Sequence, residues 1–331
     1  MPANLTAQYH KAEEAYRRAG SSDEELECLQ AMLREIPKHK GTDKLQADLK
    51  HKIAEAKKLC EKQASAAKKS AQPKIPRQGA GRVVIIGGPN AGKSSLLKAV
   101  TRAAPEVAPF PFTTREPQPG MMAWEDVQIQ LIDTPPITTD VFDSTTLGLI
   151  RGADVVLLMI DLGEDSGIDD LQAVLARIGE TKTRLGKETG LDEDDIGVSY
   201  TKALMVPNKI DLPEAGDRLA LLHEFCPLEF EEFPISAEQE TNVAELRNTI
   251  YQALGVLRVY TKSPTKKEPD YDRPYTVRHG QTLLDVAEQV HKDFAENLKY
   301  ARVWGSAIHP GSQVKGDYVL HDKDVIELHT A

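Results

Sequence analysis

Residues 83–97, VVIIGGPNAGKSSLL, run from an apolar strand through a glycine-bounded loop into the start of a helix. The loop from Gly87 to Ser94 matches the pattern G-x-x-x-x-G-K-[ST], and its place between a strand and a helix is the context that this pattern requires. In such loops the backbone N–H groups surround a β-phosphate, and the positive end of the helix dipole attracts the same anion. The stretch therefore predicts a nucleotide-binding α/β domain, and a glycine-rich turn without a ligand is the alternative.

The side chains of this loop have separate expected roles. Lys93 is placed to reach the β- and γ-phosphate oxygens and so to act in catalysis, while the Ser94 hydroxyl is placed to ligate Mg²⁺. The nucleotide-binding residues predicted in this stretch are Gly88, Pro89, Asn90, Ala91, Gly92, Lys93, Ser94 and Ser95.

Recognition of the base is expected from the run Asn208-Lys209-Ile210-Asp211, which follows a second apolar strand. The Asp211 carboxylate can accept hydrogen bonds from both the N1–H and the exocyclic amine of guanine, a pair that adenine does not offer. Ser236 and Ala237, after the last predicted strand, are expected to supply a backbone N–H for guanine O6. In this order behind the phosphate loop, the motifs select GTP and GDP over ATP.

Two further positions are predicted around the metal. Asp133, at the end of the strand VQIQLI, matches the Asp that holds Mg²⁺ in P-loop NTPases, usually through water. Thr113 and Thr114 lie in the sequence PFTT, at the position of a nucleotide-sensitive switch. One of their hydroxyls would ligate Mg²⁺ only when a γ-phosphate is present, and Thr114 is the preferred metal ligand and catalytic candidate.

Composition limits the class of protein. The chain has 331 residues, 40% apolar and 28% charged, which is long enough for two or three globular domains. No apolar run approaches a membrane span, and no secretory signal opens the sequence. The cysteines at 28, 60 and 226 have neither metal-ligand nor disulfide spacing. We therefore expect a cytoplasmic protein without a membrane partner.

Residues 38–82 carry thirteen Lys and Arg against four acidic residues, a balance of +9 in a chain whose net charge is −10. Such asymmetry is typical of a basic arm. One interpretation is contact with an RNA backbone, which clustered positive charge binds with strong salt dependence and little sequence preference. A solvated helix face followed by a linker is the other interpretation, and the sequence does not choose between them.

Periodicity and composition divide the chain into five parts. Helices are expected at 4–19, 21–36 and 43–70 as a helical hairpin. After the loop, strands alternate with helices, which predicts a parallel sheet covered by helices with 153–162 as a central strand. The segment 181–199 is expected to be an exposed acidic loop. The parts are a helical region (1–70), a linker (71–81), a G domain (82–257), a second linker (258–273) and a small mixed sheet over one helix (274–331).

The motifs GGPNAGKSS, PFTT, DTPP, NKID and ISA occur in an order that resembles the Obg/DRG branch of the translation-factor class of GTPases. Near the C-terminus, RVYTK, PDY, KYARVWG and VLHDKDVIEL resemble the TGS domain of the DRG proteins. The resemblance implies a Ras-like P-loop NTPase domain, a β-grasp TGS domain, slow hydrolysis of GTP, and association with a ribosome or structured RNA through the basic arm and the TGS domain. It leaves open a protein cofactor as a further partner, and the insert domain of the DRG proteins looks absent.

Three positions qualify this resemblance. Pro136 replaces the glycine of the family's D-x-P-G motif, and proline has no N–H to donate to a γ-phosphate. Ile137 stands where Ras-like enzymes place a water-orienting Gln. Asn90 is a candidate for holding K⁺ beside the phosphates and so for catalysis, although Asn is also a favourable turn residue. The sequence thus favours binding of GTP with Mg²⁺, and leaves open either slow, K⁺-stimulated hydrolysis or a binding module with negligible hydrolysis.

Overall fold

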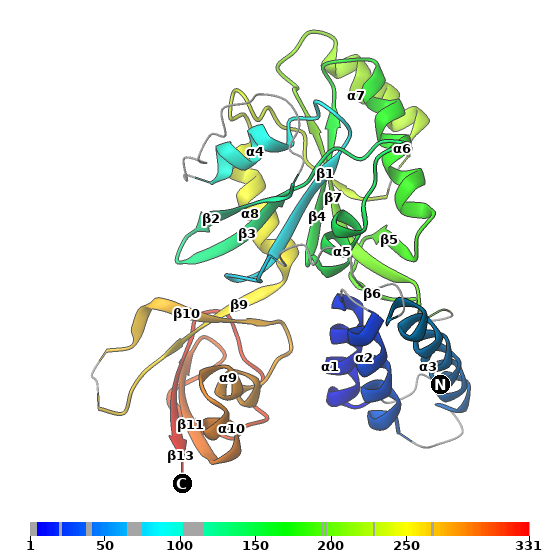
Figure 1. Ribbon diagram of the computed structural model, residues 1–331. Helices are drawn as coiled ribbons and strands as arrows, with labels where there is room; N and C mark the ends of the chain where they lie inside the picture. The colour runs from blue at the N-terminus through cyan, green and yellow to red at the C-terminus, as the bar shows by residue number, and fades with distance from the viewer. Residues whose placement is uncertain are drawn as a thin grey trace.

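A computed structural model describes residues 5–19, 22–37, 42–64, 75–101, 116–192, 195, 197–227, 229–265 and 268–330. Figure 1 shows a central sheet flanked by helices, with the N-terminal helices and a smaller C-terminal sheet below it. None of the helices in these ranges has the length and apolar character needed to cross a membrane.

The N-terminal region consists of α1 (Ala7–Arg18), α2 (Ser22–Glu35) and α3 (Asp43–Ala64). Thr6, just before α1, caps the helix: its side chain accepts a hydrogen bond from the backbone N–H of Tyr9. The apolar faces of the three helices share one small core, which includes Tyr9, Tyr16, Leu29, Met32, Ile36 and Leu49. The three predicted helices are confirmed, and residues 65–70, expected at the end of the third, lie outside the described ranges.

The central sheet has the strand order β2-β3-β1-β4-β7-β5, and β6 and β8 also pair with β7. Its strands are β1 (Arg82–Gly87), β2 (Gln118–Trp124), β3 (Val127–Asp133), β4 (Val155–Asp161), β5 (Thr183–Gly186), β6 (Gly190–Leu191), β7 (Ser199–Asn208) and β8 (Glu231–Glu232). β1, β3, β4 and β7 are parallel, whereas β2 and β3 form an antiparallel hairpin. The predicted parallel sheet is confirmed, and its strands end at one edge, where open α/β sheets bind ligands.

Helices cover both faces of this sheet (Figure 1). α4 (Lys93–Val100) and α8 (Val243–Leu254) pack on one face, and α5 (Ser144–Gly152), α6 (Ser166–Gly179) and α7 (Ala215–Phe225) pack on the other. Val83 and Ile85 of β1 enter the first core, and Val84 and Ile86 enter the second. Successive side chains of a strand point to opposite faces, so burial on both sides explains the unbroken apolar runs of β1 and β4.

The C-terminal sheet has the strand order β10-β9-β13-β11-β12. Its strands are β9 (Val256–Thr261), β10 (Asp270–Arg278), β11 (Leu298–Gly305), β12 (Ile308–Val314) and β13 (Asp324–Thr330), with the helices α9 (Leu283–Val290) and α10 (Lys292–Glu296). β9 and β13 are parallel and the other pairs are antiparallel, so the predicted mixed sheet is confirmed. α9 is fixed by a capping box between Thr282 and Asp285 and buries Leu283 and Val286 in the core of this sheet.

Two segments differ from their expected structure. The segment 181–199, expected as an acidic loop, contains β5 and β6, and pairing of β5 with β7 buries Thr183 and Ser199. Residues 258–261, expected in a linker, belong to β9, whose Leu257 and Val259 side chains lie in the core of the C-terminal sheet. Strands this short between charged residues have little periodicity, which is why the sequence pattern did not reveal them.

The tip of the β2–β3 hairpin is fastened to β9 by a buried arginine. The guanidinium of Arg258, whose side chain is 4% exposed, forms ion pairs with Glu125 and Asp126 of the tip and with Asp322 before β13. It also lies over the ring of Trp124, which stacks on Tyr251 of α8 with ring centroids 3.6 Å apart. The hairpin, α8 and the C-terminal sheet thus meet around one cation.

Candidate nucleotide site

The phosphate loop joins β1, which ends at Gly87, to α4, which begins at Lys93. Gly92 precedes the helix with φ 88°, in the left-handed region that glycine adopts most easily. A Cβ at this position would lie 2.1 Å from the side-chain nitrogen of Asn208, so only glycine fits. Asn90, at the exposed turn of the loop, also has a positive φ of 55°, a conformation that Asn tolerates better than most residues.

Lys93 is buried against its own loop. Its Nζ donates hydrogen bonds to the carbonyl oxygens of Gly88, at 2.6 Å, and Gly87, at 3.2 Å. Burial lowers the pKa of Lys93 to about 8, although the negative charges of Asp133 and Asp170 favour its charged form. The amine is therefore held at the mouth of the loop, where phosphate oxygens would replace the two carbonyl oxygens.

Binding of GDP at about pH 8.5 is expected to take up as much as about three-quarters of a proton per chain. Phosphate charge beside Lys93 favours the ammonium form, whereas in the free protein, with a pKa of about 8, most of the amine is neutral at this pH. The affinity for GDP should then fall by up to about tenfold for each further pH unit. Calorimetric titrations in two buffers of different ionisation enthalpy measure the uptake, and near pH 7, where Lys93 is mostly charged, it should be small. A binding heat independent of the buffer at the higher pH would contradict this prediction.

Ser94 and Asp133, the two described residues that the sequence predicts as Mg²⁺ ligands, lie in contact. The Ser94 hydroxyl donates a hydrogen bond to one carboxylate oxygen of Asp133, which ends β3 and is fully buried. The other oxygen, Oδ1, has no hydrogen-bond partner among the described residues. Burial raises the pKa of Asp133, against the opposing effects of Ser94 and Lys93. A hydroxyl and an unsatisfied buried carboxylate oxygen fit the Mg²⁺ arrangement of P-loop proteins, in which phosphates and water complete the shell.

The threonines expected to complete this shell, Thr113 and Thr114, lie outside the described residues.

Asn208, at the end of β7, ties the phosphate loop to the loop after β8. Its side-chain nitrogen donates to the carbonyl oxygen of Ala91 at 2.9 Å, and its Oδ1 accepts the backbone N–H of Ala237 at 2.9 Å. Asn208 is buried, so the role that the structure gives it is to hold two loops in register. The N–H of Ala237, expected to donate to guanine O6, makes this bond to Asn208. The N–H of Ser236 is likewise bonded to Thr241.

Asp211 lies on the same edge of the sheet and is exposed. Its carboxylate makes no hydrogen bond or ion pair with any residue that the structure describes. The neighbouring Lys209, with a positive φ of 69°, instead extends to Asp161 and pairs with its carboxylate. Asp211 is therefore free to accept hydrogen bonds from a base.

The turn after β3 contains the two unusual residues, Pro136 and Ile137. Ile137 is buried in the second core, and its N–H donates to the carbonyl oxygen of Gly87 at 3.2 Å. Pro136, just before it, has no N–H. Neither residue therefore has a free backbone N–H at this turn.

Sequence reasoning missed two acidic residues of the site. Asp161, at the end of β4, holds Lys209 and accepts the N–H of Gly163 at 2.7 Å. Asp170 of α6 packs against Gly88, where its β-carbon leaves no room for a side chain on the loop. Burial and the nearby charges of Asp161 and Asp169 raise the pKa of Asp170. Asp161 could have been found from its position at the end of an apolar strand, but nothing in the pattern of α6 distinguished Asp170.

Comparison with known proteins agrees with this site. Residues 82–188 match the family described as 50S ribosome-binding GTPase, and residues 257–330 match the TGS domain. An uncharacterized GTP-binding protein of Methanocaldococcus jannaschii is 28% identical over 367 residues, covering 92% of both chains. Developmentally-regulated G-protein 1 of Arabidopsis thaliana is 28% identical over 366 residues, covering 92% of this chain and 90% of that protein.

A solved structure shows the same fold. The YchF GTPase of Schizosaccharomyces pombe is 13% identical and matches with a TM-score of 0.50 over 78% of this chain and 100% of that one. One conclusion follows from the site and from the two domain matches. The site combines a phosphate loop and its lysine with a paired Ser94 and Asp133 and an exposed Asp211. The chain is a GTP-binding protein of the Obg/DRG family with a C-terminal TGS domain.

Proposed function

We propose that the chain is a ribosome- or RNA-associated GTPase that binds GTP with Mg²⁺ and hydrolyses it slowly to GDP. The observation that carries the proposal is the arrangement around Asn208, which opens the segment that bears Asp211. Asn208 donates a hydrogen bond to Ala91 in the loop of Lys93 and accepts the N–H of Ala237. One nucleotide can then meet the lysine through its phosphates and the carboxylate through its base.

Each part of the site has a role in this proposal. Lys93 and the backbone N–H groups of the loop would hold the β- and γ-phosphates and stabilise charge on the transferred group. Ser94 and Asp133 would hold Mg²⁺, which when bound neutralises phosphate charge. Asp211 would select guanine, and the N–H of Ala237 would reach O6 only by leaving Asn208, which makes base binding and loop position interdependent.

Hydrolysis is tested by steady-state phosphate release from GTP, with Lys93→Ala as the blank. We expect slow turnover with Mg²⁺ that is faster in K⁺ than in Na⁺, because Asn90 is exposed on the loop and would face a cation beside the phosphates. Asn90→Ala should remove the difference between the two salts. Equal turnover of the unaltered protein in K⁺ and Na⁺ would contradict the role of Asn90 without touching that of Lys93.

The turn at Pro136 favours a second candidate function, a nucleotide-dependent binding module with negligible hydrolysis. The first amide after Pro136, that of Ile137, is bonded to the carbonyl oxygen of Gly87, and the Ile137 side chain is buried. Tight binding of GTP with no phosphate release above the Lys93→Ala blank, in K⁺ and with ribosomes added, would establish this alternative.

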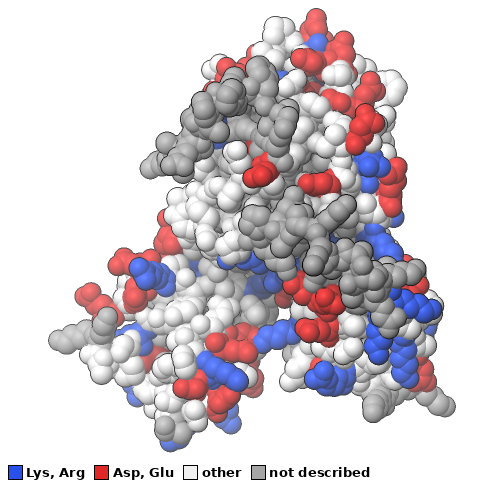
Figure 2. Space-filling model, viewed as in Figure 1, with Lys and Arg blue, Asp and Glu red and all other residues white. Residues whose placement is uncertain are grey.

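Association with RNA is proposed through α3. Lys50, Lys57 and Lys58 are exposed on this helix, and Figure 2 shows Lys and Arg side chains over the N-terminal helices while acidic side chains lie along the far end of the G domain. The family description of the G domain, 50S ribosome-binding GTPase, supports the same partner. Phosphate contacts made by clustered lysines give affinity that falls steeply with salt.

Replacing these three lysines by Glu is expected to abolish co-sedimentation with ribosomes at moderate salt. Losing about three phosphate contacts should also reduce the slope of log affinity against log salt by about three, as one contact contributes about one. Replacement of the exposed Lys98, Lys182 and Lys187 of the G domain by Glu is the charge-matched control. Unchanged binding by the α3 variant would make this helix a solvated packing element.

A further inference from the structure

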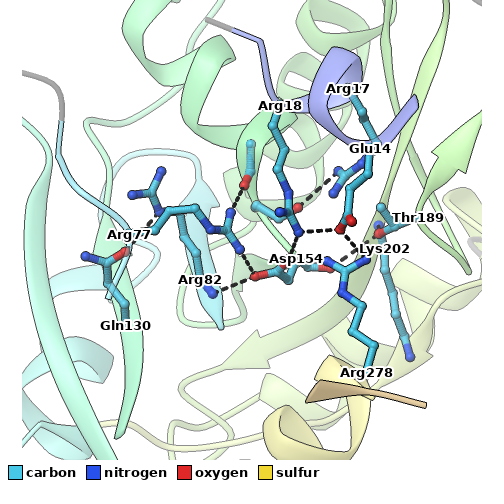
Figure 3. Close-up of polar contacts among 12 residues, drawn as sticks. Glu14, Arg17, Arg18, Arg77, Arg82, Gln130, Asp154, Thr189, Lys202 and Arg278 are labelled. Carbon is cyan, nitrogen blue, oxygen red and sulfur yellow. Dashed lines mark hydrogen bonds and ion pairs between the residues drawn. The ribbon is translucent and has the colours of Figure 1, made fainter. Parts of the chain in front are cut away.

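A second charged pocket lies away from the nucleotide site, where the N-terminal helices, the G domain and the TGS domain meet (Figure 3). It has a volume of about 200 Å³. Its charged lining residues come from α1, the segment before β1, the start of β4 and β10, and they are Glu14, Arg18, Arg77, Asp154 and Arg278.

The three arginines converge on Asp154. Arg18 approaches within 3.2 Å of one carboxylate oxygen and Arg278 within 2.9 Å of the same oxygen, while Arg77 pairs with the other. Arg18 and Arg278 also pair with Glu14. Burial alone raises the pKa of Asp154, but Arg77, the N–H of Arg82, Arg18 and Arg278 together hold it below its ordinary value. The ionised carboxylate of Asp154 thus forms ion pairs with arginines of the helical region, the segment before the G domain and the TGS domain.

Positive charge exceeds negative charge in this junction. Three guanidiniums line the pocket against two carboxylates, and two more arginines, Arg17 at 3% and Arg82 at 8% exposure, are buried behind it. Arg17 and Arg82 are bonded mainly to carbonyl oxygens and to Gln130 rather than to acids. Burial, followed by the charges of neighbouring arginines, lowers the pKa of Arg17 and of Arg82 to about 10. The junction therefore carries more positive than negative charge.

Hydrogen-bond donors also remain without acceptors at this place. Among the described residues, Nε of Arg18 and Nη2 of Arg17 are buried and have no partner. Leaving a buried donor of a charged group unsatisfied is unfavourable, because the group loses its hydrogen bonds to water without gaining others. Thr276, Gln281 and Gln289 add neutral polar groups to the wall of the pocket.

We propose that this pocket binds a small tetrahedral oxyanion of the phosphate class, orthophosphate or pyrophosphate, held by Arg18, Arg77 and Arg278. Guanidinium groups match phosphate geometry through paired N–H donors, and groups arriving from three elements suit the acceptors of a tetrahedral anion better than those of a planar carboxylate. The volume lies below the roughly 300–1,000 Å³ of pockets for drug-sized ligands, which favours a small anion.

Binding here would join three parts of the chain. Arg18 belongs to the helical region, Arg77 to the segment before the G domain and Arg278 to the TGS domain. An anion that requires all three binds only the closed arrangement, so its concentration would set how firmly the TGS domain and α1 stay docked on the G domain.

The test is equilibrium dialysis of the full-length protein with ³²P-orthophosphate while the nucleotide site is saturated with GDP and Mg²⁺. We expect one exchangeable phosphate per chain, displaced by unlabelled pyrophosphate or phosphate but not by chloride at equal ionic strength. The preferred ligand is the unlabelled anion, phosphate or pyrophosphate, that displaces the label at the lower concentration. Absence of bound phosphate beyond the background of a protein with no such pocket would overturn the proposal.

Variants make the test specific. Arg77→Gln and Arg278→Gln should each weaken phosphate binding by about tenfold to a hundredfold, the equivalent of one charge-assisted hydrogen bond. Glu14→Gln should strengthen it, because Glu14 competes for Arg18 and Arg278, and a misfolded protein could not give that result. Arg302→Gln, on the exposed side of β11, is the matched control, and GDP binding by every variant verifies folding. Phosphate affinities equal to that of the control in all three variants would place the anion elsewhere.

Discussion

Replacement of Asp211 by Asn is expected to lower the affinity for GTP and GDP by about 10²–10⁴-fold. Asp211 is exposed at the nucleotide edge and makes no bond with the described residues, so its loss should cost base recognition and little stability. Each charge-assisted hydrogen bond to guanine contributes about 1.5–3 kcal/mol, and the amide of Asn can accept only one of the two while presenting a donor to the guanine amine.

The same substitution should improve binding of xanthine nucleotides, because xanthine carries a carbonyl acceptor where guanine carries the amine. Fluorescence titration with labelled GDP and XDP measures both changes. Asp217→Asn is the control, since Asp217 is an exposed aspartate of the neighbouring helix α7. Parallel losses for GDP and XDP would mean that Asp211 supports the fold of the loop rather than reading the base.

Replacement of Arg258 by Met is expected to reduce the free energy of unfolding by about 2–3 kcal/mol. The side chain is buried, and its removal leaves Glu125, Asp126 and Asp322 close together without a counter-charge. Breaking a fully buried pair costs about 3–5 kcal/mol, and the lower figure reflects the partial exposure of these carboxylates to water. The contact of the guanidinium with the rings of Trp124 and Tyr251 would be lost as well.

Urea denaturation followed by tryptophan fluorescence and by far-UV circular dichroism measures this loss. Trp124 stacks at the interface, so its signal should report separation of the TGS domain from the G domain before the secondary structure melts. Arg302→Met, on the exposed side of β11 in the same sheet, should unfold as the unaltered protein does. A single unchanged transition in Arg258→Met would show that other contacts hold the two domains together.

The sequence was sufficient for the fold wherever one face or both faces of an element are buried. The unbroken apolar runs of β1 and β4 and the order of the loop motifs predicted the parallel sheet, the phosphate loop and the base-reading segment. These features are encoded by neighbouring residues. Short strands such as β5 and the start of β9 depend on partners far along the chain, and no local pattern marks them.

The same limit applies to polar constellations. Arg258 and Asp154 each gather partners from distant segments, so no spacing in the sequence could indicate them. The bond from the N–H of Ala237 to Asn208 was likewise invisible, because it depends on two loops that meet only after the sheet has formed. The partners of Arg258, Asp154 and Ala237 can be identified only from the three-dimensional structure, whereas the role of Lys93 follows from its eight-residue motif.

The β2–β3 hairpin is a rigid link between the nucleotide site and the C-terminal sheet. At one end of the strand pair, Gln118 lies opposite the metal-site carboxylate of Asp133, and at the other, Trp124 lies opposite Val127 beside the contacts of Arg258. Seven strand residues span about 20 Å, and a hydrogen-bonded strand pair changes little in length. A displacement of β2 beside Asp133 would therefore also displace the hairpin tip, which contacts Arg258 of the C-terminal sheet.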